Sequence, residues 1–221
     1  MAKQCLCFDM DGTLIDSMDC WNNLKYKMCD RYFERTGEKI PLKKDDEAVI
    51  ENSGLKQAIE YVNKTYNTSL DFFLDACATL QNFYLNECAV KPYVRETLDR
   101  LLEDGYKMCV MTATPYKYTV EVLKKLDLLK YFKFVLTPTE YPKCKRSRRI
   151  FFGACRRFLC LPKNAVLIDD ANYAHITAKA AGFRRVGVYD QYRDDDLKEF
   201  TDINFKDFSE LLDYYIKNKH F

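Results

Sequence analysis

The chain has 221 residues, with 35 Lys and Arg against 33 Asp and Glu, and 48% of its residues are hydrophobic. This apolar content excludes a disordered or fibrous chain, and the net charge of +2 argues against nucleic acid or an anionic membrane as a partner. No apolar run approaches the ~20 residues of a membrane span, and no signal-peptide pattern is present. We therefore expect a cytoplasmic protein with one core domain and room for a smaller insertion.

Ten cysteines and two histidines limit the chemistry that is available. No Cys-x-x-Cys pair occurs, and several cysteines lie inside apolar runs, so we interpret them as reduced, mostly buried thiols. With only His175 and His220, the chain has almost too few histidines for a histidine-based zinc site or a serine triad. Acid–base chemistry must then be carried by carboxylates.

Five short apolar runs, each followed by a polar residue, indicate strands. They are residues 5–8, 108–111, 134–136, 165–168 and 186–189. Continuous apolar runs are typical of strands that are buried on both faces of a parallel sheet. From the second run onward, helical patterns lie between the runs, including one that starts near Arg148 and one that stops at Gly182. This alternation predicts an α/β fold with a doubly wound parallel sheet, in which ligands bind beyond the carboxyl ends of the strands.

The segment between the first and second runs breaks this alternation. It shows helical periodicity in three stripes, within residues 21–32, 55–66 and 73–84, and no strand signal. It is also far longer than an ordinary crossover connection. We therefore predict that residues 17–90 form a small all-helical cap domain over the strand ends, and that residues 1–16 and 91–221 form the core domain.

The first run leads into the strongest motif of the chain, Phe8-Asp9-Met10-Asp11-Gly12-Thr13. Two carboxylates at i and i+2 before a glycine lie in a tight turn where the backbone can approach an anion. Placing two like charges together costs free energy unless a cation lies between them or their protonation states differ. Taken alone, the motif is also compatible with a solvated Asp-rich turn.

This motif resembles the first motif of the haloacid dehalogenase superfamily, and three further features follow in the family's order. Thr112 at the end of the second run resembles the phosphate-binding Ser/Thr, Lys145 the phosphate-binding lysine, and Asp169-Asp170 after the fourth run the acidic metal motif. The resemblance covers essentially the whole core. It implies a Rossmann-like α/β core with an inserted helical cap.

The resemblance also implies a chemistry, which is phosphoryl transfer with Mg²⁺. Asp9 would be the nucleophile and form an aspartyl phosphate, and Asp11 would act as general acid and then as general base. Thr112 and Lys145 would hold the phosphoryl oxygens. The metal would be bound by Asp9, the backbone carbonyl of Asp11, Asp169 and Asp170. An acid at position 11 favours phosphate esters as substrates, since the dehalogenase and phosphonate-cleaving members lack it.

The segment that begins at Lys143 departs from the family pattern. Lys145-Arg146-Ser147-Arg148 stands where the family usually has Lys-Pro-x-Pro, so Lys143 is a rival for the role of the lysine. The basic cluster that runs from Lys143 to Arg157 is also unusual. We interpret it as a solvated helix face, with attraction of a polyanionic substrate as the alternative.

Trp21 bears on the choice between two reactions. It stands where the beta-phosphoglucomutase branch of the family has a histidine associated with protecting the phosphoenzyme from water, and an indole cannot relay a proton. The leading hypothesis is therefore a phosphatase of a small phosphorylated metabolite. A phosphosugar mutase is the second hypothesis, and a non-enzymatic or macromolecule-directed member the third.

Substrate specificity is expected to come from the predicted cap. Trp21 and Lys56 are the candidate residues for it, although Trp21 is more simply explained as packing near the hinge and Lys56 as an exposed lysine at a helix start. The sequence indicates neither which metabolite is bound nor the oligomeric state.

Overall fold

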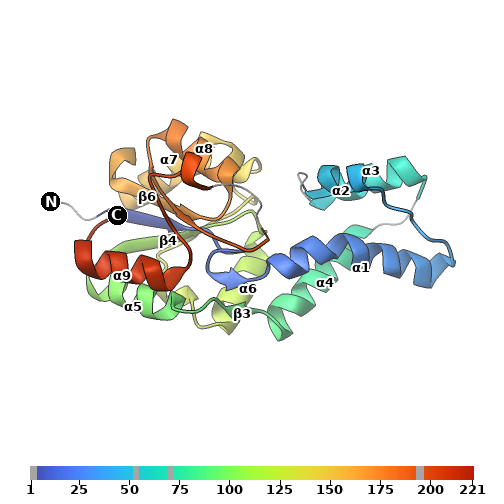
Figure 1. The fold of residues 1–221 in the computed structure, drawn as a ribbon, viewed down its shortest axis with the longest axis horizontal. Coiled ribbons are helices and arrows are strands. Elements are labelled where there is room, and N and C mark those ends of the chain that lie inside the picture. Colours follow the sequence, from blue (N-terminus) through green and yellow to red (C-terminus); the bar gives the residue numbers. More distant parts are fainter. Residues whose placement is uncertain (1–3, 52–54, 69–71, 193–196) are drawn as a thin grey trace. The chain divides into compact units, whose positions relative to one another are not determined.

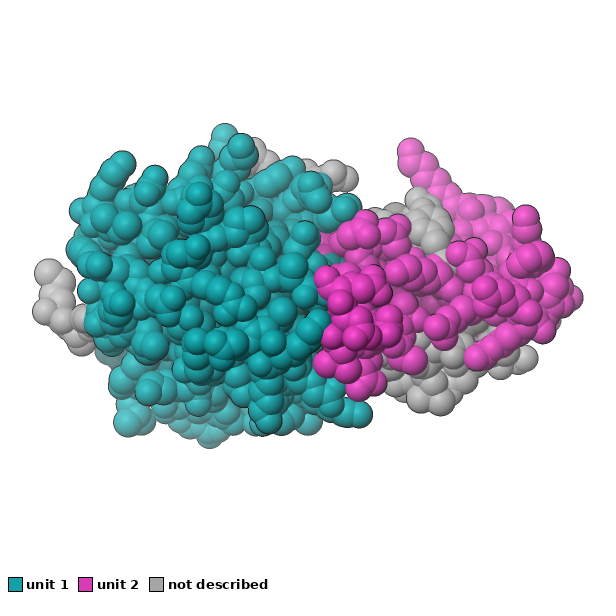
Figure 2. All heavy atoms as spheres, turned by 90° about the horizontal axis from the view of Figure 1, so that it is seen from below, with its two compact units in different colours: residues 1–17, 88–221 teal, residues 18–87 magenta. Residues whose placement is uncertain are grey.

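The computed structural model describes residues 4–51, 55–68, 72–192 and 197–221 (Figure 1). The chain divides into two compact units, residues 1–17 with 88–221, and residues 18–87 (Figure 2). The divisions lie at 17/18 and 87/88, whereas the sequence suggested 16/17 and 90/91. β2 (Ile15–Asp16) and β3 (Ala89–Val90) form a short antiparallel ladder that the sequence did not indicate, and this ladder keeps both connecting segments with the first unit.

The first unit is built on a six-stranded sheet with the order β5-β4-β1-β6-β7-β8. These strands are β1 (Cys5–Phe8), β4 (Lys107–Met111), β5 (Val135–Leu136), β6 (Ala165–Asp169), β7 (Arg184–Val188) and β8 (Ile203–Phe205). Every neighbouring pair is parallel, which confirms the predicted doubly wound α/β class. The chain winds from β1 toward β5 and then from β6 toward β8. The switch point of the sheet therefore lies between β1 and β6.

Helices cover both faces of this sheet. α7 (Arg148–Phe158) and α8 (Asn172–Ala181) lie over one face, and α5 (Val94–Glu103) and α9 (Phe208–Asn218) over the other (Figure 1). α6 (Tyr116–Lys125) connects β4 to β5. Because side chains alternate along a strand, Cys5 and Cys7 of β1 pack on the α7–α8 side, and the ring of Phe8 meets Phe132 on the other. All four residues of β1 are consequently buried.

Two helix ends in this unit follow from local sequence. Gly182 ends α8 in the left-handed conformation at φ 81°, as its position in the sequence predicts. Ser147 begins α7, and its hydroxyl oxygen accepts a hydrogen bond from the backbone N–H of Arg149 at 3.4 Å. β8 was not predicted, because an edge strand of three residues with a polar centre carries no continuous apolar run.

All the regular secondary structure in the described residues of the second unit is helical. It contains α1 (Met18–Thr36), α2 (Lys44–Glu51), α3 (Leu55–Tyr66) and α4 (Phe72–Asn86). The predicted apolar stripes supply its core, which includes Leu24, Met28, Ile59, Val62, Leu80 and Tyr84. Buried Asp46 accepts hydrogen bonds from the hydroxyls of Tyr61, at 2.6 Å, and of Tyr66. Within the described ranges, no helix has the length and apolar character needed to cross a bilayer.

Candidate active site

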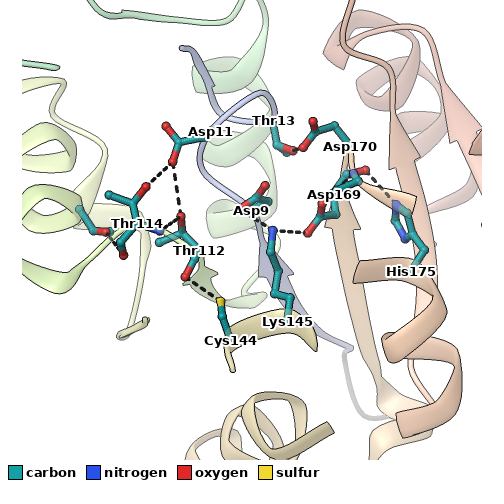
Figure 3. Close-up of polar contacts among 12 residues, drawn as sticks. Asp9, Asp11, Thr13, Thr112, Thr114, Cys144, Lys145, Asp169, Asp170 and His175 are labelled. Atoms are coloured by element: carbon teal, nitrogen blue, oxygen red, sulfur yellow. Dashed lines mark hydrogen bonds and ion pairs between the residues drawn. The ribbon is translucent and has the colours of Figure 1, made fainter. Parts of the chain in front are cut away.

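Three carboxylates meet at the carboxyl edge of the sheet (Figure 3). Asp9 follows β1 directly, Asp169 is the last residue of β6, and Asp170 comes next. All three are buried, and one oxygen from each lies within 4.8 Å of the others. The backbone N–H of Asp9 donates to the carbonyl of Ile168 at 2.9 Å, which joins the two strand ends. The cluster therefore lies at the switch point, where doubly wound folds bind their ligands.

Lys145 contributes a cation to this cluster. Its Nζ is 2.8 Å from Asp9 Oδ1 and 2.7 Å from Asp169 Oδ2, and its side chain is only 1% exposed. Lys143, the rival from the sequence, is exposed. The two lysines differ because a short 3-10 turn, η2 (Cys144–Arg146), directs position 145 inward. Cys144 is strained in the left-handed region at φ 41°, and its thiol donates to the carbonyl oxygen of Thr112 at 3.1 Å.

Burial dominates the electrostatics of the cluster. It raises the pKa of Asp9 well above the usual carboxyl value; Lys145 opposes this shift, and Asp169 and Asp170 add to it. Burial also works against the charge of Lys145, but Asp169 and Asp9 outweigh burial and hold the pKa of the ammonium well above its usual range. The cluster thus sets three buried acids against one ammonium, and a further cation would lower the free-energy cost of ionising Asp9 beside Asp169 and Asp170.

The donor set fits a hard divalent cation. Octahedral oxygen ligands at ~2.1 Å from Mg²⁺ lie roughly 3 to 4.2 Å apart, close to the spacing of the three carboxylates. Two of these carboxylates are oriented by donors behind them: Thr13 Oγ1 donates to Asp170 Oδ1 at 3.2 Å, and the N–H of Ala171 donates to Asp169 Oδ1 at 2.9 Å. In the part of the chain that the structure describes, no other cluster of His, Cys, Asp or Glu suits a metal.

Asp11 is held by hydroxyl groups on the other side of the site (Figure 3). Ser17 Oγ donates to its Oδ1 at 2.7 Å, and Thr114 Oγ1 donates to its Oδ2 at 2.7 Å. The hydroxyl of Thr112 is 3.5 Å from the same Oδ2. Ser17 and Thr114 were not predicted as site residues from the sequence. Their signal was weak: each is a hydroxyl residue in a loop that leaves the carboxyl edge, with no motif of its own.

The turn after Asp9 depends on Gly12, whose φ of 80° is unfavourable for other residues. Within the turn, the N–H groups of Leu14 and Ile15 both donate to the carbonyl of Met10, at 2.9 and 3.1 Å. Lys91 fixes the turn from outside, because its Nζ donates to the carbonyl of Gly12 and pairs with Asp190, each at 2.5 Å. The positions of Asp9 and Asp11 are thus set by backbone geometry rather than by free side-chain rotation.

His175 lies behind the acidic pair and was not assigned a role from the sequence. Its Nε2 is 3.0 Å from the carbonyl oxygen of Asp169. A carbonyl only accepts, so Nε2 carries the proton, and the buried Nδ1 has no hydrogen-bond partner in the described structure. Burial also lowers the pKa of His175. The residue is therefore a neutral support for the backbone at Asp169.

The two candidate specificity residues belong to the helical unit. Trp21 lies in α1, and its indole N–H donates to the hydroxyl of Tyr84 in α4 at 3.1 Å. This hydrogen bond within the helical unit supports a packing role for Trp21. The side chain of Lys56 lies outside the described residues.

Comparison with known proteins agrees with this arrangement. The model of the haloacid dehalogenase-like hydrolase family matches residues 6–188. A phosphorylated carbohydrates phosphatase of Thermotoga maritima is 26% identical over 180 residues, covering 81% of this chain and 82% of that protein. A phosphoglycolate phosphatase of Haemophilus influenzae is 25% identical over 228 residues, covering 93% and 95%.

Solved structures extend the likeness to the whole fold. A candidate beta-phosphoglucomutase of Thermotoga maritima superposes with a TM-score of 0.78 at 20% identity, covering 97% of this chain and 99% of that one. CbbY of Rhodobacter sphaeroides, solved with phosphate, gives 0.75 at 19% identity, covering 95% and 96%. With its family match from residue 6 to residue 188, its parallel sheet and its buried acidic cluster, the chain belongs to the haloacid dehalogenase-like hydrolases.

Proposed function

We propose that the chain is a Mg²⁺-dependent phosphatase of small phosphorylated compounds, and that it works through an aspartyl phosphate on Asp9. The observation that carries the proposal is the separation of two carboxylates in one turn. Asp9 is buried against Lys145 and the acidic pair, whereas Asp11 is held by hydroxyls. Two acids in such different environments suit two different roles. Relatives named as phosphatases support the same class of reaction.

In the first step, an Asp9 oxygen forms a bond to phosphorus while the bond from phosphorus to the leaving oxygen breaks. Asp11 gives a proton to that oxygen. In the second step, Asp11 takes a proton from water as the water attacks the phosphorus, which releases inorganic phosphate and regenerates Asp9. Lys145 Nζ and Thr112 Oγ1 are the donors for the phosphoryl oxygens.

Asp9, Asp169 and Asp170, with the backbone carbonyl of Asp11, would hold the magnesium ion. When bound, Mg²⁺ supplies positive charge for the phosphoryl oxygens and reduces repulsion between the phosphate and Asp9. The support for this assignment is the 4.8 Å cluster of three buried oxygens and its fit to an oxygen-ligand cation. Thr13 and Ala171 donate the hydrogen bonds that orient Asp170 and Asp169 in this site.

We assign the helical unit, residues 18–87, the role of a cap that restricts the site to small substrates. Its insertion shortly after the turn of Asp9 and Asp11 supports this role, because the first connecting segment follows that turn in the sequence and the second, β3, pairs with β2. Trp21 and Lys56 stay candidates for contacts with the part of the substrate away from the phosphate. We expect residues of this unit to determine which phosphorylated compound is the substrate.

The proposed phosphatase is expected to release inorganic phosphate from monoesters without any bisphosphate activator. A mutase must keep its phosphoenzyme from water, and Trp21 offers no titratable group for such control. The test is a panel of phosphorylated sugars and small phosphorylated acids, assayed with magnesium and with chelator, and read as released phosphate. Conversion of glucose 1-phosphate to glucose 6-phosphate is followed in parallel. Trp21→His is expected to add no isomerase activity.

Two results would contradict this proposal. Isomer formation that outpaces phosphate release and rises with added bisphosphate would establish the mutase instead. Phosphate release that is unaffected by chelator would remove the metal from the proposal but leave the nucleophile in place. Circular dichroism of Trp21→His serves as the control for folding, because the change removes the hydrogen bond to Tyr84.

Thr114→Val is expected to lower kcat about tenfold with little change in KM, since it deletes one hydroxyl that holds Asp11 and part of the acid–base contribution is lost. Thr114→Ser keeps the donor and is expected to retain most of kcat. Thr177→Val, which deletes a hydroxyl bonded within α8, is the matched control and should behave as wild type. Equal losses in Thr114→Val and Thr114→Ser would show that the effect follows the packing of the side chain and not the hydrogen bond to Asp11 alone.

A further inference from the structure

The charge of the chain is divided unevenly along its length. Residues 141–189 contain eleven of the 35 basic residues and only two of the 33 acidic ones, Asp169 and Asp170, both of which are buried in the candidate site. The rest of the chain therefore has 24 basic residues against 31 acidic ones. The net charge of +2 thus hides a basic segment in an otherwise acidic chain. This segment includes both helices of one layer, α7 and α8.

The outer surface of this layer combines cations with exposed apolar side chains. On α7, Arg149, Phe152 and Arg156 recur at three- and four-residue spacing and so share one face, while Ile150, Ala154 and Phe158 are buried beneath. Leu159 follows directly after the helix. Phe152 is 47% exposed, Leu159 91%, Leu161 59%, and Ile176 on α8 53%. The basic–apolar face comprises Arg149, Phe152, Arg156, Leu159, Leu161, Lys163, Ile176 and Lys179. α7 and α8 pack together over the same side of the sheet (Figure 1).

Leu159 is not explained by the stability of the unit. It ends α7 in the left-handed conformation, at φ 57° and ψ 47°, which is unfavourable for a residue with a side chain. Gly182, at the corresponding end of α8, is the residue that this geometry favours. Leu159 thus combines backbone strain with nearly complete exposure of an apolar side chain. A binding partner that covers the Leu159 side chain would account for both features.

The cations of this face are also not neutralised by any residue that the structure describes. The described structure contains ion pairs for the neighbouring Arg157, with Glu140 at 2.8 Å, and for Arg185, with Asp202 at 2.5 Å. Among the same described residues, Arg149, Arg156, Lys163 and Lys179 form no salt bridge. These four cations are therefore exposed to solvent, next to apolar side chains that are also exposed.

We propose that the basic–apolar face binds an anionic lipid surface. Cations near such a surface are attracted by its negative headgroups, and Phe, Leu and Ile side chains gain free energy by entering the boundary between headgroups and acyl chains. A nucleic acid would engage the cations and could stack a base on Phe152, but it would leave Leu159, Leu161 and Ile176 exposed, since bases stack on aromatic rings. The face is the outer surface of two helices, which a deformable interface accepts without a matching pocket.

The orientation of α7 places the Leu159 end of this face away from the candidate site. α7 connects two parallel strands, β5 and β6, so it runs back toward their amino ends. Leu159 and Leu161 therefore lie near the amino edge of the sheet, shortly before β6 begins at Ala165. Asp9 and Asp169 lie at the carboxyl edge. Leu159 and Leu161 therefore lie toward the opposite edge of the sheet from the candidate site.

The test is co-sedimentation of the full chain with vesicles of phosphatidylcholine alone or mixed with phosphatidylserine, at low and at physiological salt. Binding is expected only with phosphatidylserine. The double variant Arg149→Glu/Arg156→Glu is expected to weaken it on the order of 10²-fold, because each reversal replaces an attraction by a repulsion. Leu159→Gly is expected to weaken it about tenfold through loss of apolar contact. Since glycine suits the left-handed position, this variant should not lower Tm.

Lys124→Glu/Lys125→Glu, which changes two exposed lysines of α6, is the control with equal charge change and should bind like wild type. Absence of binding to phosphatidylserine vesicles at low salt would overturn the proposal. So would an equal loss in the α6 control together with no loss in Leu159→Gly, because binding would then follow net charge alone. Tighter binding to a single-stranded oligonucleotide, or a dimer in solution that Leu159→Gly dissociates, would assign the face to nucleic acid or to a second copy instead.

Discussion

Asp9→Asn is expected to reduce phosphate release to background, a loss on the order of 10⁴-fold or more, because the amide cannot attack phosphorus to form the covalent intermediate. The fold should survive, since Asn keeps the shape of the side chain and removes one of three clustered carboxylates. The measurement is turnover of the best substrate from the phosphometabolite panel, with circular dichroism as the control for folding. Substantial residual turnover in a folded variant would exclude the covalent route through Asp9.

The same variant gives a test that does not depend on activity. Asp9 has a raised pKa in the folded protein, so its contribution to stability is complete below the ordinary carboxyl pKa of about 4 and is lost as pH rises through the folded-state pKa. In chelator, the Tm of wild type relative to Asp9→Asn should therefore fall as pH rises. Magnesium should raise the Tm of wild type more than that of the variant, because Asp9 is a proposed ligand. A Tm difference that stays constant with pH would contradict the raised pKa.

Lys145→Ala is expected to lower kcat/KM by about 10²-fold or more, whereas Lys143→Ala should stay near wild type. Lys145 is buried and contacts both Asp9 and Asp169, and Lys143 is exposed two residues away. The same change removes the cation from between buried acids, so a loss of stability of about 3–5 kcal/mol is expected as well. Kinetics should therefore be measured at a temperature where Tm shows Lys145→Ala to be folded.

Magnesium separates the structural effect of this lysine from its effect on the reaction. A bound cation offsets the repulsion that Lys145→Ala creates, so saturating magnesium should restore part of the lost Tm. It should not restore kcat/KM, because the donor to the phosphoryl oxygen is still missing. Recovery of both together would show that Lys145 only stabilises the cluster. An equal or larger kinetic loss in Lys143→Ala would move the phosphate-binding role to the exposed lysine.

Much of the core could be predicted from the sequence because its strands are buried on both faces. Such strands appear as continuous apolar runs, and the residue after each run must lie at the carboxyl edge of a parallel sheet. This reasoning predicted the α/β class and brought Asp9, Thr112 and Asp169 to the same edge of the sheet. The strands that it missed, β2, β3 and β8, are two or three residues long and carry no continuous apolar run.

The environment of each side chain was decided by tertiary structure. Lys143 and Lys145 are the same residue type two positions apart, and only the η2 turn, with Cys144 in its strained conformation, places Lys145 between Asp9 and Asp169. Likewise, the hydroxyls that hold Asp11 come from positions 17 and 114, which are far apart in the chain. A pattern in sequence records local periodicity and burial. Hydrogen bonds between distant loops depend on how the strands are ordered in the sheet, and no local pattern contains that order.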